Sequence, residues 1–427
     1  MKLIVHQTER LEGAVTIPAS KSHTIRAIIL AALAEGRSRL GHPLFSDDTR
    51  AAINACRAIG ARIEQTDTEL IIDGVGARPH KPTAVLDMLN SGTSTNLMLG
   101  VLAALGVAAE ITGDTSLRTR PVSALCDALQ HLGCTITYHD RPDCPPLSIC
   151  GKLRGGSVSL DAGKSSQYVS SLLIAAALAE TDTEILVANP TELPYIDLTL
   201  HWLDTQSIRY TRDGYTRFCV QGRQAFRPFN KQIPADWSSA AFPLCAAAMT
   251  RSDVLIKGID INDIQGDKAI ISYLEAMGAA ITSDPNGIRI KGAPLNGTAL
   301  DINATPDALP ALAAIGCFSN GTTKLYNVAQ ARVKETDRIT VMANELAKLG
   351  GRIDELPDGL IIHHSRLSGA QVHGHHDHRV VMALSLAGLT AQHKTVIDTA
   401  EAIAVTYPHY IKSMQSIGAN FKLQEEV

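Results

Sequence analysis

Aromatic residues and charges are both scarce in this chain of 427 residues. Aromatics make up only 4% of the sequence, so the core must be built from Ala, Leu, Ile and Val. Charged residues make up 19%, the net charge is −4, and neither a basic tail nor a block of like charge occurs. Because nucleic-acid-binding proteins carry a basic footprint, we expect no nucleic-acid partner.

Long apolar runs and paired cysteine motifs are also lacking. The longest uncharged apolar run, Asn96 to Ala109, is too short to span a bilayer, so we expect no membrane contact. The N-terminal residues predict a strand start rather than a signal peptide. None of the eight cysteines forms a CxxC pair, and most lie in apolar or strand-like contexts, as reduced thiols do. We therefore expect a cytoplasmic protein.

A short phrase recurs along the chain: an apolar residue, Gly, two further residues and another apolar residue. Each phrase follows an amphipathic helical pattern and is typical of a helix C-cap that leads into a strand. The intervals between the glycines are 73, 145, 72 and 68 residues, and Ser207 stands where the interval of 145 predicts a sixth Gly. The chain therefore contains six units of roughly 72 residues. The five glycines are Gly60, Gly133, Gly278, Gly350 and Gly418.

A polar cluster opens an Ala- and Leu-rich helix in each of the six units. These helices are nearly free of charge, and a helix that is apolar all round is buried. The amphipathic helix of each unit must then lie outside. The six predicted buried helices span 27–34, 97–105, 169–179, 240–248, 309–318 and 380–389.

A buried helix in every unit favours closed domains over an open solenoid. Two large domains are also the expectation for 427 residues. Three units around three parallel central helices make one domain, and the polar stretch 228–234 is the expected break. We predict a first domain over 20–233 and a second over 1–19 plus 234–427.

The starts of parallel buried helices emerge together on one face of a domain. Each start presents unpaired N–H groups and a partial positive charge. Two such faces opposed to each other form an anion-binding cleft. We therefore expect an active site for an anionic ligand in the cleft between the domains.

The segment 332–338, Arg-Val-Lys-Glu-Thr-Asp-Arg, places three cations and two carboxylates in seven positions. Lys334 and Arg338 are four residues apart, so on a helix they share one face and form a clamp for phosphate or carboxylate. Glu335 stands beside Lys334 and can transfer a proton. The alternative for the segment alone is a solvated, ion-paired helix start.

The other polar clusters hold further candidate ligands. Lys21, Ser22 and Arg26 lie within a turn and a half of one helix, although the GxxxxGK[ST] pattern of a P-loop is absent. Asp307 opens a helix that has no other charge, and it is either an N-cap or a general base. A capped or solvated helix start remains the alternative for each cluster. The remaining candidates are the Gly-bearing turn 90–93, Arg120 in front of Pro121, and Ser165, Ser166 and Gln167.

Four histidines and an aspartate between His373 and His378 suggest a metal cluster. The histidines before Asp377 fit a surface loop, however, and the adjacent cation of Arg379 disfavours a metal ion. We expect no metal site.

Taken in order and spacing, these motifs resemble the enolpyruvyl transferases, and most of all those whose acceptor is shikimate 3-phosphate. The resemblance covers nearly the whole chain; Arg-Val-Lys-Glu-Thr-Asp-Arg and Gln265-Gly-Asp-Lys268 are its specific motifs. It implies an α/β fold, a two-domain inside-out α/β barrel in which each domain has three βαβαββ repeats. It also implies a monomer, no cofactor, and domain closure that excludes water from the intermediate.

In the implied reaction, phosphoenolpyruvate is protonated at its methylene carbon while the 5-hydroxyl of shikimate 3-phosphate attacks the adjacent carbon. The resulting ketal then loses phosphate. Asp307 would take the hydroxyl proton, and Glu335 with Lys21 would serve the methylene proton and the leaving phosphate. The residues implied to hold shikimate 3-phosphate are Lys21, Ser22, Arg26, Ser165, Ser166, Gln167, Tyr195, Asp307 and Lys334. Those implied to hold phosphoenolpyruvate are Lys21, Gly92, Arg120, Gln167, Arg338 and Arg379.

Four positions depart from the family pattern. Asn96 and Val405 replace an Arg and a Lys that usually lie near phosphoenolpyruvate, and Gln330 replaces an Asn. Glu192 replaces a Ser that usually touches the phosphate of the acceptor, and a carboxylate there repels that phosphate.

These departures leave open a relative that uses another acceptor, such as one without phosphate. A non-catalytic anion-binding protein is a third possibility, although binding alone does not require Asp307, Glu335 and Lys21 together. The cell-wall enzyme that acts on a UDP-sugar shares the fold, but its loop cysteine has no evident counterpart here.

Overall fold

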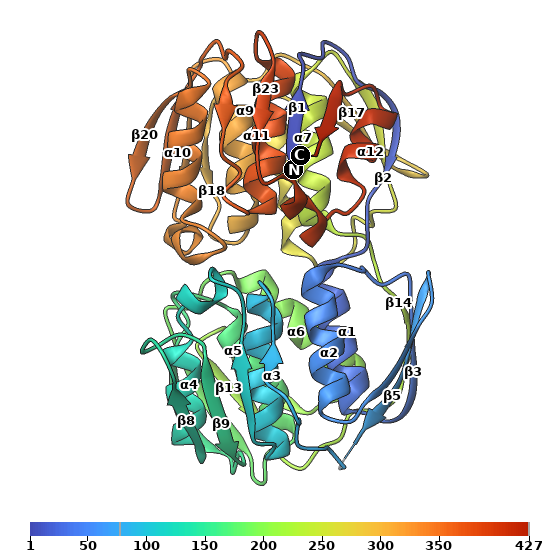
Figure 1. Cartoon of the computed structure of the whole chain (residues 1–427), viewed down its shortest axis with the longest axis vertical. Coiled ribbons are helices and arrows are strands. Elements are labelled where there is room, and N and C mark those ends of the chain that lie inside the picture. The colour runs from blue at the N-terminus through green and yellow to red at the C-terminus, as the bar shows by residue number, and fades with distance from the viewer. Residues whose placement is uncertain (77, 426–427) are drawn as a thin grey trace. The chain divides into compact units, whose positions relative to one another are not determined.

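The computed structural model describes residues 1–76 and 78–425. The chain forms two compact units, which we call unit 1 (Met1–Pro18 and Pro234–Val427) and unit 2 (Ala19–Ile233). Figure 1 shows the course of the chain through both.

Unit 2 contains six α-helices and twelve strands among the described residues. The helices are α1 (Lys21–Leu33), α2 (Asp47–Ala58), α3 (Gly92–Leu105), α4 (Ser123–His131), α5 (Gln167–Ala177) and α6 (Leu193–Thr205). The strands are β3 (Glu35–Gly41), β4 (Arg62–Gln65), β5 (Glu69–Val75), β6 (Leu86–Asp87), β7 (Ala109–Thr112), β8 (Cys134–Tyr138), β9 (Leu147–Gly151), β10 (Gly156–Asp161), β11 (Thr183–Ala188), β12 (Tyr210–Asp213), β13 (Arg217–Val220) and β14 (Asn230–Gln232).

Unit 1 has the same content over the residues that the structure describes. Its helices are α7 (Trp237–Met249), α8 (Ile270–Ala276), α9 (Leu309–Phe318), α10 (Arg338–Lys348), α11 (His378–Thr390) and α12 (Tyr410–Ser416). Its strands are β1 (Lys2–Val5), β2 (Glu12–Thr16), β15 (Asp253–Lys257), β16 (Ala280–Asp284), β17 (Gly287–Lys291), β18 (Ala299–Asp301), β19 (Thr322–Tyr326), β20 (Arg352–Leu356), β21 (Gly359–His363), β22 (Gln371–Val372), β23 (Thr395–Ile397) and β24 (Phe421–Gln424).

Six four-stranded sheets of one topology occur in the described part of the chain. In the sheet β10-β11-β13-β12, for example, β10 and β11 are parallel, while β13 is antiparallel to both β11 and β12. After each strand of the parallel pair the chain must run back to the end of the sheet at which the strands begin. The helix that follows each strand does this, so both helices of a repeat run in the same direction. The predicted α/β fold of βαβαββ repeats around buried helices is confirmed.

Three strands occupy places that sequence order alone does not assign to them. β2 leads into α1 but pairs in parallel with β15, whereas β14 leads into α7 but pairs in parallel with β3. β1 completes the sheet of β22, β23 and β24 and lies antiparallel to both β23 and β24. Each unit is thereby closed with strands from distant parts of the chain.

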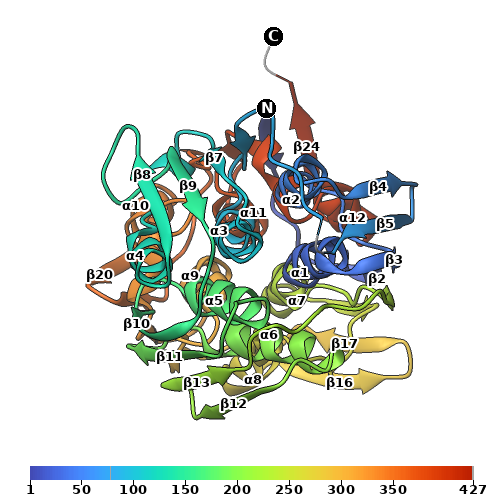
Figure 2. The ribbon, with the colours of Figure 1, turned by 90° about the horizontal axis from the view of Figure 1, so that it is seen from below.

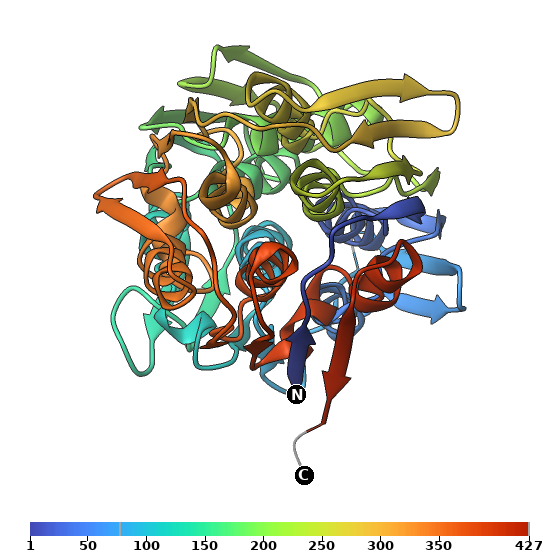
Figure 3. The same ribbon diagram turned by 90° about the horizontal axis from the view of Figure 1, so that it is seen from above.

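The first helix of each repeat is buried, as predicted from its lack of charge. α1, α3 and α5 lie inside unit 2, where Figure 2 shows them nearly end-on. α7, α9 and α11 lie inside unit 1, where Figure 3 shows them nearly end-on in olive, orange and red. In the described residues, no helix is long and apolar enough to cross a membrane.

Candidate active site

Arg26 is the central cation of the candidate residues in unit 2. Its side chain is fully buried, and its five acceptors among the described residues are neutral oxygens. Burial lowers the pKa of Arg26 to about 10, so the guanidinium stays charged at neutral pH. It therefore carries a positive charge that an anion can neutralise. Its acceptors are Thr199 Oγ1 (2.8 Å), the Ser22 carbonyl (3.2 Å), Gln167 Oε1 (3.1 Å), Ser170 Oγ (3.4 Å) and the Tyr195 carbonyl (3.2 Å).

The start of α5 brings Ser165, Ser166 and Gln167 close to Arg26. Ser165 Oγ accepts from the Gln167 amide at 3.2 Å, and both side chains are half-buried. Ser166 is buried and donates its hydroxyl to Glu192 Oε2 at 2.8 Å. The carboxylate of Glu192 therefore accepts the only hydroxyl hydrogen bond that Ser166, a residue predicted to bind the phosphate of the substrate, can donate.

Lys21, the first residue of α1, forms an ion pair with Asp48 near the start of α2. The Lys21 Nζ to Asp48 Oδ2 distance is 3.0 Å, and the Lys21 side chain is 13% exposed. Because both helices of the repeat run the same way, the outer helix also directs its start toward the predicted site. Asp48 belongs to the surroundings of Lys21 although sequence reasoning did not identify it.

Gly92 and Arg120, predicted from different motifs to bind the same ligand, are neighbours. A Cβ atom at Gly92 would lie 3.2 Å from Arg120 Nη1. That nitrogen donates to the Asn90 carbonyl at 3.0 Å, and Nη2 donates to the Asn90 side chain and to Ser116 Oγ at 3.1 Å. The turn before α3 thus fixes the guanidinium beside the amide groups that open the helix.

In unit 1, one guanidinium lies among three carboxylates. Arg338 is fully buried and donates to Asp377 Oδ2 from Nε at 2.8 Å, to Asp307 Oδ1 from Nη1 at 2.8 Å, and to Glu335 Oε2 from Nη2 at 2.5 Å. Burial acts to lower the pKa of Arg338, but Asp377, Glu335 and Asp307 outweigh it and raise that pKa well above its usual value.

Asp307 lies between two cations. Besides Arg338, its Oδ2 is 2.8 Å from Arg379 Nη2, and the same nitrogen donates to Ser238 Oγ at 3.0 Å. Burial alone raises the pKa of Asp307, but the charges of Arg379, Arg338 and Lys334 outweigh it, and the net pKa lies well below the usual value. The contacts of Ser238, Asp307 and Arg379 also show that α7, α9 and α11 start together.

The prediction that Lys334 and Arg338 share one helix face is wrong. α10 begins at Arg338, with Asp337 as its N-cap, and Lys334 follows a short 3₁₀ helix that ends at Val333. The Asp337 carboxylate accepts from the Thr340 amide at 3.1 Å and stops the helix from extending toward Lys334. Lys334 and Glu335 therefore lie in a loop, and the Glu335 side chain is 15% exposed.

The four departures from the family pattern have different surroundings. Asn96 is buried, and its Oδ1 meets no hydrogen-bond donor among the described residues. Gln330 donates to the Asn303 carbonyl at 3.0 Å, and Val405 ends a short 3₁₀ helix. Glu192 is buried in front of α6 with a positive φ of 51°.

The histidine segment binds carboxylates. His373 Nδ1 is 2.6 Å from Asp398 Oδ1, and His375 Nε2 is 2.9 Å from Glu345 Oε1. The residues that the structure describes contain no cluster of His, Cys, Asp and Glu suited to a metal ion.

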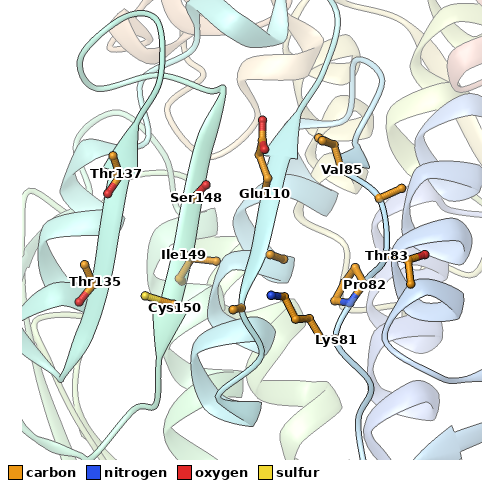
Figure 4. Close-up of a pocket in the computed structure, with 13 residues that line it drawn as sticks. Lys81, Pro82, Thr83, Val85, Glu110, Thr135, Thr137, Ser148, Ile149 and Cys150 are labelled. Atoms are coloured by element: carbon orange, nitrogen blue, oxygen red, sulfur yellow. The ribbon is translucent and has the colours of Figure 1, made fainter.

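A shallow hollow of about 450 Å³ lies elsewhere, on the outward side of β7, β8 and β9 (Figure 4). Lys81, Glu110 and Cys150 line it, together with threonines and small side chains. Its lining contains none of the predicted site residues, so it does not contribute to the candidate site.

Two acidic residues of the site had only a weak signal in the sequence. Asp48 stands at the start of an ordinary amphipathic helix, whereas Asp377 begins a polar cluster that opens a predicted buried helix, directly after the histidines that we interpreted as a surface loop. Their partners, Lys21 and Arg338, are 27 and 39 residues away. Only their position at helix starts pointed to them.

Three comparisons with known proteins agree on one family. The sequence profile described as EPSP synthase (3-phosphoshikimate 1-carboxyvinyltransferase) matches residues 5–414. A 3-phosphoshikimate 1-carboxyvinyltransferase of Acetivibrio thermocellus is 45% identical, with 99% of this chain and 100% of the relative covered. A protein of the same name from Ruminiclostridium cellulolyticum is 44% identical, with 98% and 99% covered. A solved structure of EPSP synthase from Acinetobacter baumannii has a TM-score of 0.84 at 30% identity, with 99% and 100% covered.

Proposed function

The chain belongs to the EPSP synthase family, and from this premise we propose which of its side chains carry the reaction. It transfers the enolpyruvyl group of phosphoenolpyruvate to the 5-hydroxyl of shikimate 3-phosphate and releases phosphate. The alternative of another acceptor is not favoured, because relatives at 44–45% identity over nearly the full length carry the same name.

The acceptor, shikimate 3-phosphate, is assigned to Arg26 and the groups around it. Arg26 supports this role because it is a buried cation whose acceptors in the described part of the chain are all neutral oxygens, so its charge remains available to an anion. The further acceptor ligands in this proposal are Lys21, Ser22, Ser165, Ser166, Gln167, Tyr195, Lys334 and Asp307.

Phosphoenolpyruvate is assigned to arginines that other side chains hold in fixed positions. Arg120 is held by Asn90 and Ser116, and Arg379 is held by Asp307 and Ser238. A guanidinium that is already oriented binds a carboxylate or phosphate with little loss of conformational entropy. The remaining phosphoenolpyruvate ligands in this proposal are Lys21, Gly92, Gln167 and Arg338.

Asp307 accepts the proton of the 5-hydroxyl as the new C–O bond forms. Its carboxylate is 20% exposed, so a substrate can reach it. Its lowered pKa makes it a weak base while Arg379, Arg338 and Lys334 dominate its surroundings. An anion bound beside these cations offsets part of their field, and the pKa of Asp307 then rises toward the range that base catalysis requires.

Glu335 and Lys21 serve the other half of the reaction. The methylene carbon of phosphoenolpyruvate gains a proton to form the tetrahedral ketal, and it loses a proton when phosphate leaves. Glu335 fits this exchange because it is partly exposed and hydrogen-bonded to Arg338. The ammonium of Lys21 stabilises the charge of the departing phosphate.

The proposed function depends most on one observation, the carboxylate of Asp307 between the guanidinium groups of Arg338 and Arg379. The test is the release of phosphate from phosphoenolpyruvate with shikimate 3-phosphate, with shikimate, and without an acceptor. We expect rapid release with shikimate 3-phosphate alone. Release that is faster with shikimate would overturn the assignment of the acceptor.

We further propose that the enzyme acts as a monomer in the cytoplasm. Its eight cysteines are free thiols, as is usual in a reducing compartment. Light scattering coupled to gel filtration tests the monomer, because a dimer elutes with twice the chain mass of 45.6 kDa.

A further inference from the structure

Glu192 is a buried carboxylate in front of α6, the helix that carries the proposed acceptor ligand Tyr195. It directly precedes α6, is 1% exposed, and adopts a left-handed backbone conformation with φ 51° and ψ 43°. Its Oε2 accepts from Ser166 Oγ at 2.8 Å and from the Ser166 amide at 3.4 Å. Among the described residues, the carboxylate makes no capping hydrogen bond to α6, and it instead contacts Ser166, the N-cap residue of α5, where a helix start attracts anions.

The hydrogen bonds around Glu192 have a fixed direction. Arg26 only donates, so the Gln167 oxygen faces it, at 3.1 Å, and the Gln167 nitrogen faces Ser166 Oγ, at 3.4 Å. Ser166 in turn donates its single hydroxyl proton to Glu192. The chain Arg26, Gln167, Ser166, Glu192 therefore links a buried cation to a buried carboxylate through two neutral side chains.

The hydrogen bond to Glu192 leaves Ser166 with no proton to offer a ligand. A serine hydroxyl has one proton to donate, and a phosphate group only accepts near neutral pH. While Ser166 donates to Glu192, it can offer a ligand only its lone pairs. Ser165, by contrast, accepts from the Gln167 amide at 3.2 Å and donates its hydroxyl to no residue that the structure describes.

We infer that Glu192 is a positioning residue that sets acceptor specificity: it keeps Ser166 from donating to the acceptor's phosphate and weakens the preference for a phosphorylated acceptor. This inference rests on the proposed function. The carboxylate acts in two ways, because it engages the hydroxyl proton of Ser166 and because its charge repels the phosphate. Ser165 and Arg26 then supply the donors that the phosphate uses.

The test is a double-mutant cycle of Glu192→Gln and Ser166→Ala, read as KM and kcat with each acceptor. We expect Glu192→Gln to lower KM for shikimate 3-phosphate at least threefold. It should leave kcat and KM for phosphoenolpyruvate within twofold. The ratio of kcat/KM for shikimate 3-phosphate over that for shikimate should rise at least threefold. Ser166→Ala should raise KM for shikimate 3-phosphate by a smaller factor in the wild-type background than in the Glu192→Gln background, where it should abolish the gain.

Two further variants control for charge and folding. Glu180→Gln removes an exposed carboxylate beyond the other end of α5 and should leave every kinetic parameter unchanged. Glu192→Ser removes the charge with a smaller side chain and should act in the same direction as Glu192→Gln. A loss of more than about 10 °C in melting temperature in both Glu192 variants would show a purely structural residue and overturn the inference.

The outcomes separate this inference from the proposed function. An unchanged or higher KM for shikimate 3-phosphate in an active Glu192→Gln enzyme would overturn the role of Glu192 alone. An equal effect of Ser166→Ala in both backgrounds would do the same. Wild-type enzyme that releases no phosphate with shikimate 3-phosphate would overturn the function and the inference together.

Discussion

The carboxylate of Asp377 binds the guanidinium of Arg338 from two directions, with Oδ2 2.8 Å from Nε and Oδ1 3.2 Å from Nη2. Both side chains are fully buried, and they open α11 and α10 respectively. A buried ion pair costs desolvation energy, but removal of one partner leaves an uncompensated charge in the interior. This pair therefore fixes the start of α10 beside the start of α11 in the candidate site.

Asp377→Asn should lower the free energy of unfolding by about 3 kcal/mol, because Arg338 then loses a buried counter-charge. Urea denaturation followed by circular dichroism measures this change. Asp354→Asn is the matched control, since its carboxylate is 68% exposed and, among the described residues, pairs only with His363 at 3.0 Å. An equal loss of stability in both variants would contradict the buried-pair argument.

Acid should destabilise the chain through Asp307 and Asp377. Burial acts to raise the pKa of each, but for Asp307 the charges of Arg379, Arg338 and Lys334 outweigh it, and for Asp377 that of Arg338 does. With a pKa lowered on folding, each carboxylate binds fewer protons in the folded state, so its contribution is present above the unfolded pKa of about 3.9 and is lost as the pH falls below it.

We therefore expect the melting temperature to start to fall near pH 5 and to drop most steeply below about pH 4, toward the lowered pKa values of the folded state. The slope should be smaller in Asp377→Asn, which lacks one of the two groups. Differential scanning fluorimetry over this range measures both slopes. Identical slopes would show that other groups dominate the acid transition.

Asp307→Asn should lower kcat at least about 100-fold, because the amide cannot accept the proton of the attacking hydroxyl. The affinity for phosphoenolpyruvate should stay within about threefold, since the amide oxygen still accepts from one of the two arginines. Stopped-flow phosphate release and isothermal titration calorimetry separate the two effects. Asp354→Asn serves as the control again, and a protein that only binds anions has no turnover to lose.

Gly92→Ala should raise KM for phosphoenolpyruvate about fivefold or more and leave KM for shikimate 3-phosphate nearly unchanged. The added methyl lies 3.2 Å from Arg120 Nη1, so the guanidinium must shift by a few tenths of an ångström. Steady-state kinetics with each substrate varied in turn measures the two constants. Gly214→Ala is a control for the loss of a glycine, because its Cβ meets no heavy atom within 4 Å; its φ of 53° predicts some strain but no change in KM. A rise in both constants in Gly92→Ala would point to a general disturbance of unit 2.

Thiol reactivity should follow burial. Burial raises the pKa of Cys56, Cys126 and Cys317 to about 12 and that of Cys134 to about 11, so these groups carry almost no thiolate at pH 8. Cys150 is exposed and Cys219 is half-buried. Ellman's reagent should modify Cys150 at once, Cys219 more slowly, and the other thiols only in denaturant. Cys150→Ser should remove the fast phase, and a fast phase that persists would refute this order.

The periodic features of the fold could be predicted from the sequence because they are local. A helix without charge, such as α9 with Pro306 and Asp307 in front of it, must be buried wherever it lies. The residues of the candidate site remain a prediction, which the sequence allowed because they stand at helix starts that occur once in every repeat. The helix predicted to carry Lys334 and Arg338 failed because Asp337 is the N-cap, and the apolar pattern that begins at Ile339 does not by itself fix the residue at which the helix begins.

The sequence by itself determined the six repeats, the buried helices and the chemical character of the site, because each depends on the order of residues within one helix or strand. Only the tertiary structure decided which charges meet. Lys21 with Asp48, Ser166 with Glu192 and Arg338 with Asp377 are pairs from different helix starts. Their distances depend on how strands pair, and β1, β2 and β14 show that pairing joins segments far apart in the chain.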